Sequence, residues 1–312
     1  MNAPVPLPPL DTQVQGPDGT LALTRWPAPG KPVLVLIHGY PDNRRKWRAV
    51  AEILQQDFEV VAYDVRGAGD SFKPKGRAAY RLDRLTADFR AVIDAISPHA
   101  PVHLAAHDWG SVQGWEFVTE TALAGRIASF TACSGPCLDH VGWWMREQMR
   151  RPSGQGVQNM LKQSIQSWYI YFFQLPWLPE ALWHSVMGKK WPALMRAVER
   201  TPIEPRPTQA SDGAHGVNLY RANFFQRLSH PRERIAHAPV QLLVATLDRY
   251  VSPAINGGLE RWVPQLSRRE IRAGHWVTLK EPALYAQAVR EHIEQIQPPP
   301  SPAPSPAPVG PA

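Results

Sequence analysis

The sequence predicts an α/β fold: a mostly parallel sheet flanked by helices, with a helical cap inserted into it. Short apolar runs alternate with segments of helical periodicity at both ends of the chain, a pattern typical of parallel sheets covered on both faces. The middle of the chain differs, because it is rich in Trp, Tyr, Phe and Met and its helical stretches are broken by Pro. With 312 residues, 44% of them hydrophobic, the chain can bury a large core.

The individual elements follow from local patterns. Residues 12–26 alternate around a Pro-Asp-Gly turn, which predicts a hairpin. The other strands are expected where the chain is continuously apolar, and the helices where apolar residues recur every three or four positions. The expected strands are 33–37, 58–63, 102–105, 127–132, 240–245 and 269–272, and the expected helices are 44–56, 82–96, 112–119 and 284–296.

The order of these elements predicts three regions. An α/β core is expected to combine residues 1–138 with residues 240–297, and a helical cap to occupy residues 139–239. The aromatic residues of the cap are expected partly to pack on the core and partly to line an apolar cavity beside it. Residues 298–312 are a proline-rich tail that cannot build a core, so we expect it to be extended and disordered.

The chain is basic, with a net charge of +7. Some of this charge lies on a helix expected to face solvent, in Arg44, Arg45, Lys46 and Arg48. No basic stripe alternates with exposed aromatic residues, which argues against nucleic-acid binding. The charge is compatible with modest attraction to anionic membranes. Because the sequence shows neither a secretory leader nor a run long enough to span a bilayer, we expect a cytoplasmic protein without stable membrane insertion.

Cys133 and Cys137 are the two cysteines of the chain. In a cytoplasmic protein such a pair is expected to remain as buried thiols. A Cys-x₃-Cys pair alone offers too few ligands for a metal site, and no Gly-rich nucleotide-binding unit is apparent. The sequence therefore predicts neither a metal nor a cofactor.

The segment around Asp108 carries the most chemical information. This aspartate lies between an apolar strand and a helical segment, with the small residues Ala106 and Gly110 two positions to either side. A strand that turns abruptly into a helix crowds the backbone at those positions, and the residue at the apex is exposed above the sheet. A carboxylate at that apex predicts a nucleophile for a strained or activated saturated carbon.

Such a nucleophile needs a base that activates water and an acid that orients the base. His275, in the loop before the last helix, is the predicted base. Asp248, just past the end of a buried strand, is the predicted acid, and Asp139 is a second candidate for the same role. His107 adjoins Asp108, but adjacent residues at a sharp turn point in different directions, which indicates a structural role.

Hydrolysis of an ester on Asp108 also needs backbone N–H donors for the oxyanion. One donor is expected from Trp109, directly after the nucleophile. The other is expected from Tyr40, in a turn where Gly39 and Pro41 permit an unusual backbone path that includes a cis bond before the proline.

Together these residues resemble the epoxide hydrolases of the α/β-hydrolase superfamily, over nearly the whole chain from residue 12 to residue 297. His38-Gly39-Tyr40-Pro41 is similar to the family's H-G-x-P motif, and His107-Asp108-Trp109-Gly110 to its nucleophile elbow. Residues 64–71 are similar to its D-x-R-G-x-G-x-S loop, and residues 134–140 to the matching segment of bacterial proteins in which such a hydrolase is fused to a short-chain dehydrogenase.

The resemblance implies an α/β-hydrolase fold with a catalytic triad of Asp108, His275 and Asp248. It also implies a pair of cap tyrosines that hold and protonate the epoxide oxygen. Tyr169, within residues 168–176, and Tyr220, within residues 218–223, occupy the matching positions, although the neighbouring Tyr171 stays an alternative to the first. Substrate contacts are expected from Tyr169, Tyr220 and Trp109.

The implied activity is hydrolysis of a small hydrophobic epoxide to a vicinal diol, through a covalent ester on Asp108, by a monomer or homodimer. The main alternative is a haloalkane or haloacid dehalogenase, which shares the aspartate nucleophile but needs donors for a halide; Tyr40 stands where its usual asparagine would be. A serine esterase is disfavoured because no Gly-x-Ser-x-Gly motif occurs. A binding protein without catalysis is the remaining alternative.

Overall fold

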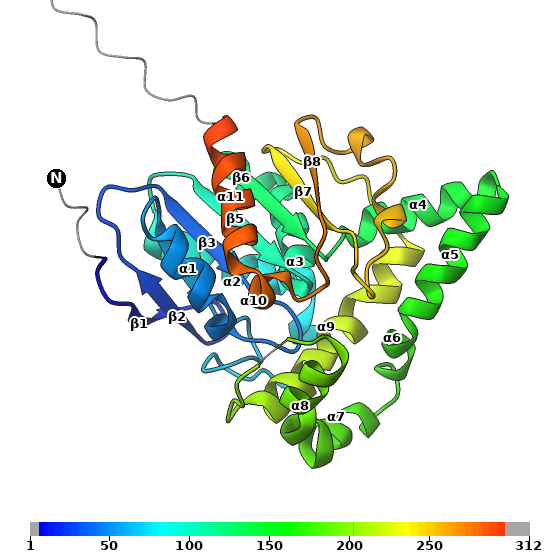
Figure 1. Ribbon diagram of the computed structural model, residues 1–312, viewed down its shortest axis with the longest axis horizontal. Helices are drawn as coiled ribbons and strands as arrows, with labels where there is room; N and C mark the ends of the chain where they lie inside the picture. The colour runs from blue at the N-terminus through cyan, green and yellow to red at the C-terminus, as the bar shows by residue number, and fades with distance from the viewer. Residues whose placement is uncertain (1–5, 202, 297–312) are drawn as a thin grey trace, which may run out of the picture.

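The computed structural model describes residues 6–201 and 203–296, and its central feature there is an eight-stranded sheet with the order β1-β2-β4-β3-β5-β6-β7-β8 (Figure 1). The first two strands form an antiparallel hairpin that also pairs antiparallel with β4, and the pairs from β4 to β8 are all parallel. The sheet is thus mostly parallel, as predicted. The strands are β1 (Leu10–Gln15), β2 (Thr20–Trp26), β3 (Val33–Ile37), β4 (Glu59–Tyr63), β5 (Val102–His107), β6 (Ile127–Cys133), β7 (Val240–Ala245) and β8 (Leu266–Ile271).

Helices cover both faces of the sheet because its central strands are apolar on both sides. In β3, Leu34 and Leu36 pack into one hydrophobic cluster, whereas Val35 and Ile37 pack into the other; this alternation is the two-residue period of a strand. The first face carries α1 (Arg48–Leu54), α10 (Val277–Lys280) and α11 (Pro282–Ile296), and the second α2 (Leu82–Ile96) and α3 (Trp109–Val118). Short 3₁₀ turns are η1 (Arg44–Trp47), η2 (Arg77–Tyr80), η3 (Thr121–Leu123), η5 (Pro253–Asn256) and η6 (Leu259–Arg261).

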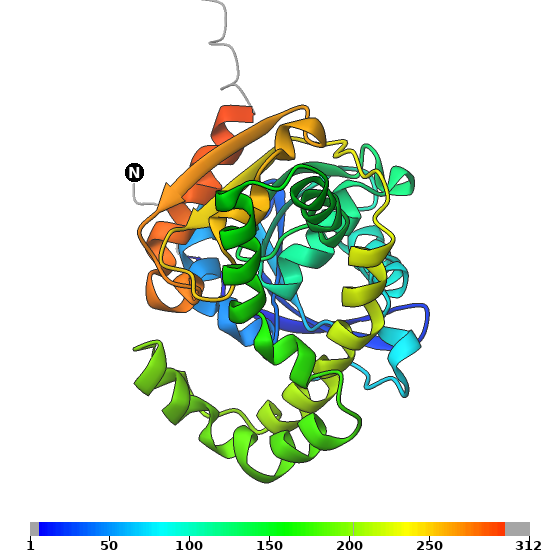
Figure 2. The ribbon, with the colours of Figure 1, turned by 90° about the vertical axis from the view of Figure 1, so that its right-hand side faces the viewer.

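Between β6 and β7, the elements of the described residues are all helices, joined by loops. Figures 1 and 2 show these helices as a layer beside the sheet, with α5 and α6 on the side that faces the viewer in Figure 2. We keep the word cap for this segment. Its elements are α4 (Leu138–Arg150), α5 (Gly154–Gln166), α6 (Trp168–Phe172), α7 (Leu178–Leu182), the π-helical η4 (Trp183–Met187), α8 (Gly188–Val198) and α9 (Gln209–Ser229).

Most predicted elements lie within a few residues of the observed ones, and the differences have local causes. The helix expected over 44–56 begins as the 3₁₀ turn η1 and becomes α-helical only at Arg48. The strand expected over 269–272 runs from Leu266 to Ile271. The first residues of β8 were not predicted because the strand has no continuous apolar run. It lies at the edge of the sheet and is partly exposed, so its centre is polar.

Two basic residues expected at the surface are buried. Arg44 is ion-paired with Asp64 and Asp70, and Lys46 lies 3.0 Å from Oδ2 of Asp42. The prediction of a fully solvated basic helix is therefore wrong for these two positions. Buried charges of this kind persist only when they are paired. The carboxylates that pair with Arg44 lie in a loop 20 or more residues away, whereas Asp42 is four residues before Lys46.

The cysteines are free, buried thiols, as predicted. No helix within the described ranges is long and apolar enough to cross a bilayer. The tail predicted over residues 298–312 lies outside the described residues.

Candidate active site

Asp108 sits on a sharp turn between β5 and α3. Its backbone has φ 56° and ψ −126°, a conformation that is uncommon for any residue with a side chain. Close packing around the turn requires glycine at two positions. A Cβ on Gly39 would lie 2.2 Å from Oδ1 of Asp108, and a Cβ on Gly110 would lie 2.1 Å from the carbonyl oxygen of Ile37.

The two carboxylate oxygens of Asp108 have different surroundings. The backbone N–H of Tyr40 donates to Oδ1 at 2.6 Å, and the N–H of Trp109 also donates to the carboxylate. Oδ2 instead faces His275, with its Nε2 atom 3.6 Å away. The predicted backbone donors of Tyr40 and Trp109 thus both act on this carboxylate, and Oδ2 is the oxygen that faces the imidazole.

The turn that presents Tyr40 is braced by His38. Nδ1 of His38 donates to the carbonyl of Gly39 at 2.9 Å, and its Nε2 accepts the N–H of Val65 at 2.9 Å. Both ring nitrogens are thus used by a neutral imidazole, and burial lowers the pKa of His38 accordingly. The Tyr40–Pro41 peptide bond is cis, as predicted.

His275 lies between the two predicted carboxylates. Its Nδ1 donates to Oδ2 of Asp248 at 3.0 Å, while Nε2 is directed at Asp108. Asp248 is held in turn, because its Oδ1 accepts the backbone N–H groups of Tyr250 at 2.8 Å and Val251 at 3.1 Å. The arrangement fixes which nitrogen of His275 carries the proton and which can accept one.

Burial and charge act against each other on these groups. Burial favours the neutral imidazole of His275, but Asp248 and Asp108 outweigh it and raise its pKa. Burial also raises the pKa of Asp108, although His275 and the two N–H donors oppose the shift. For Asp248 the balance is reversed, since His275 and its backbone donors overcome burial and lower the pKa. Asp248 thus stays ionised, as an orienting acid must.

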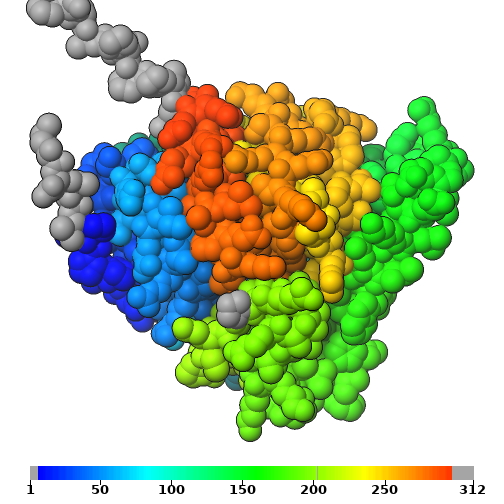
Figure 3. Space-filling model, in the orientation of Figure 1, coloured from blue at the N-terminus to red at the C-terminus, as the bar shows by residue number. Residues whose placement is uncertain are grey.

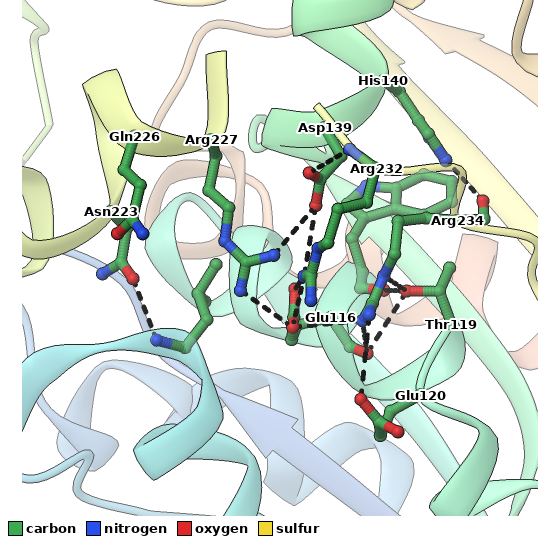
Figure 4. A network of polar contacts seen from close by, with 12 residues as sticks. Glu116, Thr119, Glu120, Asp139, His140, Asn223, Gln226, Arg227, Arg232 and Arg234 are labelled. Carbon is green, nitrogen blue, oxygen red and sulfur yellow. Dashed lines mark hydrogen bonds and ion pairs between the residues drawn. The ribbon is translucent and has the colours of Figure 1, made fainter. Parts of the chain in front are cut away.

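Asp139, the second candidate for the acid, takes part in a different cluster. It is buried at the start of α4, where it lies 3.2 Å from Arg227 and 3.5 Å from Arg232. Figure 4 shows these arginines between Asp139 and Glu116 of α3, and Arg234 also lies against Glu116. This cluster joins the cap to the core and makes no hydrogen bond to His275.

A mostly apolar cavity opens at Asp108 and runs between α4, α5 and α9. Tyr169, Tyr220 and Trp109 line it beside the carboxylate. The two tyrosine rings meet edge to face with centroids 5.9 Å apart, and the Trp109 ring is 4.8 Å from that of Tyr220. Burial raises the pKa of both tyrosines; the charge of Asp108 is the next cause for Tyr169, and Tyr169 followed by Asp108 for Tyr220. Both hydroxyls are therefore protonated, and both residues line the same cavity.

Tyr171 also lines the cavity, but it is 55% exposed and lies outside the ring contacts that join Tyr169 to Tyr220. It belongs to the outer end of the cavity. The structure thus gathers the predicted pair beside Asp108 and places the alternative tyrosine away from it.

One contributor to the site was missed from the sequence. Lys46 donates to Nδ1 of His107 at 2.9 Å, and Nε2 of His107 donates to the backbone carbonyl of His275 at 2.6 Å. A carbonyl only accepts, so His107 must carry its proton on Nε2 and accept from the lysine. Burial, then Lys46, keep the pKa of His107 well below its usual value. This network holds the backbone of His275, and no sequence periodicity signals it because Lys46 lies in a basic run.

No cluster of three or more His, Cys, Asp or Glu suited to a metal ion occurs within residues 6–201 and 203–296.

The fold and the elbow define the class of protein. The family model of the alpha/beta hydrolase fold matches residues 32–282, so the chain belongs to that family. Within it, the predicted similarity to epoxide hydrolases is confirmed. The chain is 25% identical over 284 residues to epoxide hydrolase 1 of Caenorhabditis elegans, covering 86% of this chain and 66% of the relative. It is 30% identical over 151 residues to human epoxide hydrolase 4, covering 48% of this chain and 38% of that one.

A higher identity, 36% over 292 residues, relates the chain to the probable oxidoreductase EphD of Mycobacterium tuberculosis, covering 89% of this chain. The chain spans about half the length of that relative, at 48%. Among solved structures, the epoxide hydrolase of Bacillus megaterium in complex with an inhibitor aligns with a TM-score of 0.74 at 22% identity, covering 91% of this chain and all of the other. At this identity the structural match shows the shared fold.

Proposed function

We propose that this chain is an epoxide hydrolase that opens a hydrophobic epoxide to a vicinal diol through an ester on Asp108. One observation carries the proposal: Asp108 lines an apolar cavity together with Tyr169 and Tyr220, and the oriented imidazole of His275 lies 3.6 Å from its Oδ2 atom. The relatives named as epoxide hydrolases support the same reaction.

In the first step, Oδ2 of Asp108 attacks a ring carbon of the epoxide. The new C–O bond forms as the ring C–O bond breaks, and the released alkoxide takes a proton from Tyr169 or Tyr220. Because the pKa of each tyrosine is raised, the hydroxyl is fully protonated beforehand and donates as the charge develops. Ring strain helps the opening.

In the second step, the ester is hydrolysed at the Cγ atom of Asp108. Nε2 of His275 takes a proton from water, and the hydroxide adds to Cγ. The resulting oxyanion is Oδ1, which already accepts the N–H of Tyr40, and the N–H of Trp109 is the second donor to this carboxylate. Collapse breaks the bond between Cγ and the ester oxygen, and the protonated His275 gives its proton to the departing alkoxide, so that the diol leaves. The second proton of the water remains on the Asp108 carboxyl group and returns to the tyrosinate, which restores the starting state.

This mechanism is tested by trapping the ester. His275→Gln keeps a side chain of similar size but removes the base, so turnover should fall by about 10²–10⁴-fold. The peptide that contains Asp108 should then gain the mass of the substrate, with styrene oxide and a fatty-acid epoxide as the two probes. Asp108→Ala is the control and should show neither ester nor turnover. Wild-type turnover by Asp108→Ala would overturn the proposal.

The dehalogenase alternative needs free donors for a halide. Trp109 is the indole nearest the carboxylate, but its side chain is hydrogen-bonded to Tyr220. Because the indole N–H of Trp109 is engaged with Tyr220, it is not free to bind a halide, and we therefore favour an epoxide as the substrate. Release of halide from a haloalkane by the wild-type protein would reverse that preference.

A further inference from the structure

The outward side of α5 and α6 is apolar. Residues Val157, Leu161, Ile165, Trp168 and Tyr171 recur at helical spacing along these two helices, which are separated only by one residue. All five are exposed, including 72% of Ile165 and 66% of Trp168. A helix normally turns such a stripe toward the core. Here it faces away from the protein, and we call it the outer stripe.

The outer stripe is part of a larger apolar surface on the cap. Most of the exposed large hydrophobic residues in the described ranges lie there, and the rings of Tyr171 and Phe225 pack together with centroids 5.7 Å apart. Figure 3 shows the cap as the green and yellow-green side of the molecule, on the right and below. The other exposed apolar residues of this surface are Met149, Leu175, Trp177, Leu178, Leu182, Val186, Leu194 and Val198. A surface of this kind marks an interaction site.

The charge around this surface is positive. Residues 143–200 contain eight Lys and Arg against three Glu. One of those glutamates, Glu180, is neutralised by an ion pair with Arg221. Seven of the basic residues are exposed: Arg150, Arg151, Lys162, Lys189, Lys190, Arg196 and Arg200. A second copy of the chain would bring the same cations face to face, so a negatively charged partner fits better.

We propose that this face of the cap docks on the surface of an anionic lipid bilayer. Exposed Trp and Tyr among apolar side chains, bordered by Lys and Arg, are what the headgroup region accommodates. The outer stripe runs along its helices, so α5 and α6 would lie flat in the interface. No helix of the described residues could cross the bilayer, and the docking is therefore peripheral and reversible.

Docking would also determine which end of the cavity faces the bilayer. Ser164 and Tyr171 both line the cavity that contains Asp108, and both are exposed on α5 and α6. The outer end of the cavity therefore opens beside the outer stripe. This step rests on the proposed function: the epoxide would be one carried on a lipid chain, delivered from the bilayer without crossing water.

Vesicle sedimentation with the full chain tests the docking. We expect binding to vesicles of phosphatidylcholine with 30% phosphatidylglycerol. Binding to phosphatidylcholine alone should be much weaker, because each basic residue near an anionic surface contributes favourably to the binding free energy. The double variant Ile165→Ser/Trp168→Ser should need about tenfold more lipid for half-binding. Lys189→Glu/Lys190→Glu should do so by about tenfold as well.

Matched controls separate docking from folding. Leu10→Ser removes an apolar residue of similar exposure (55%) from β1, and Lys31→Glu/Lys75→Glu reverses two exposed charges outside the cap. Both should bind as the wild type does. Turnover of water-dispersed styrene oxide should be unchanged in all four variants.

The outcomes are distinct. Absence of vesicle binding by the wild type, or equal binding by the cap variants, would overturn the docking. A dimer in sedimentation velocity that Ile165→Ser/Trp168→Ser converts to a monomer would also overturn it, by showing a second copy on the face. Vesicle binding without turnover of any epoxide would leave the docking standing and refute the proposed function instead.

Discussion

The ammonium group of Lys46 lies 2.9 Å from Nδ1 of His107, in the interior of the protein. Lys46 also pairs with Asp42, and its cation lies 5.4 Å from the ring centroid of Trp276. A lysine is thus fixed behind the catalytic loop, where it touches none of the reacting atoms. It acts through His107 on the backbone of His275, and its charge also acts to lower the pKa of Asp108 and of His275, so we regard it as a positioning residue.

Replacing this lysine should impair both stability and turnover. Lys46→Met keeps the length of the side chain but removes the donor to His107 and the charge opposite Asp42. We expect the free energy of unfolding to fall by about 3 kcal/mol, as for other buried pairs that lose one partner. Turnover should fall by about tenfold to a hundredfold through displacement of His275. Urea unfolding and steady-state kinetics measure the two effects.

Arg45→Met is the matched control for this substitution. Arg45 is next in the chain, yet its side chain is 65% exposed and lies 3.7 Å from its partner Asp70. Exposed pairs of this kind contribute about 0–1 kcal/mol. Loss of turnover equal to that of Lys46→Met would contradict the positioning role.

The charge of Asp108 should set the titration of His275. Because Asp108 raises the pKa of His275, Asp108→Asn should lower it, and NMR titration of the imidazole measures the change. Asp139→Asn removes a buried carboxylate elsewhere and should leave this pKa unchanged. A rise in Asp108→Asn, or no change, would contradict the geometry.

The same coupling predicts how turnover depends on pH. Formation of the ester removes the negative charge of Asp108, so the pKa of His275 falls at the step where it must accept a proton. Neutral His275 is required for ester hydrolysis, and the rate should therefore fall as the pH drops through that lowered pKa. In single-turnover experiments, the acid midpoint of ester hydrolysis should lie below the pKa of His275 in the free protein.

The tyrosine pair should act on ring opening and not on ester hydrolysis. Tyr169→Phe and Tyr220→Phe each leave one hydroxyl, so each should slow formation of the ester by about 10–100-fold, less than the roughly 10²–10⁴-fold of a general acid that is lost completely. The double variant should be far slower. Rapid-quench measurement of the ester separates the two steps. Tyr171→Phe is the control, and an equal effect there would reopen the choice of tyrosine.

The charged cluster of Figure 4 should stabilise the junction of cap and core. Glu116→Gln leaves Arg227, Arg232 and Arg234 with one carboxylate fewer in a buried site. We expect it to lower the free energy of unfolding by about 3 kcal/mol. Glu52→Gln removes an exposed partner of Arg48 and should change it by about 0.5 kcal/mol or less. Thermal unfolding distinguishes the two.

The sequence was sufficient where a local pattern determines the outcome. The apolar runs of β3 and β7 predict buried strands, and the small residues beside Asp108 predict its turn, because packing leaves few alternatives there. Lys46 and Arg44 could not be placed, since their burial depends on groups that are distant in sequence: His107 for Lys46 and Asp64 for Arg44.

The cap was harder still to predict. Its aromatic residues were expected to pack or to line a cavity, and Phe173 and Trp183 do pack inward. Trp168 and Trp177 are exposed instead. Composition alone cannot distinguish these cases, because the side of a helix that meets the core is decided by how the cap helices sit on the sheet.

The contact between Tyr40 N–H and Oδ1 of Asp108 has a consequence for the fate of individual atoms. In the proposed cycle, the diol carries away the oxygen that faces His275, and water replaces it. Oδ1, which accepts the backbone N–H of Tyr40, stays in the protein unless the carboxylate rotates. In ¹⁸O-water, Asp108 should therefore acquire a single ¹⁸O atom, however many cycles elapse. One carboxylate oxygen is exchanged with water in every cycle, and the other is the atom incorporated when the protein was synthesised.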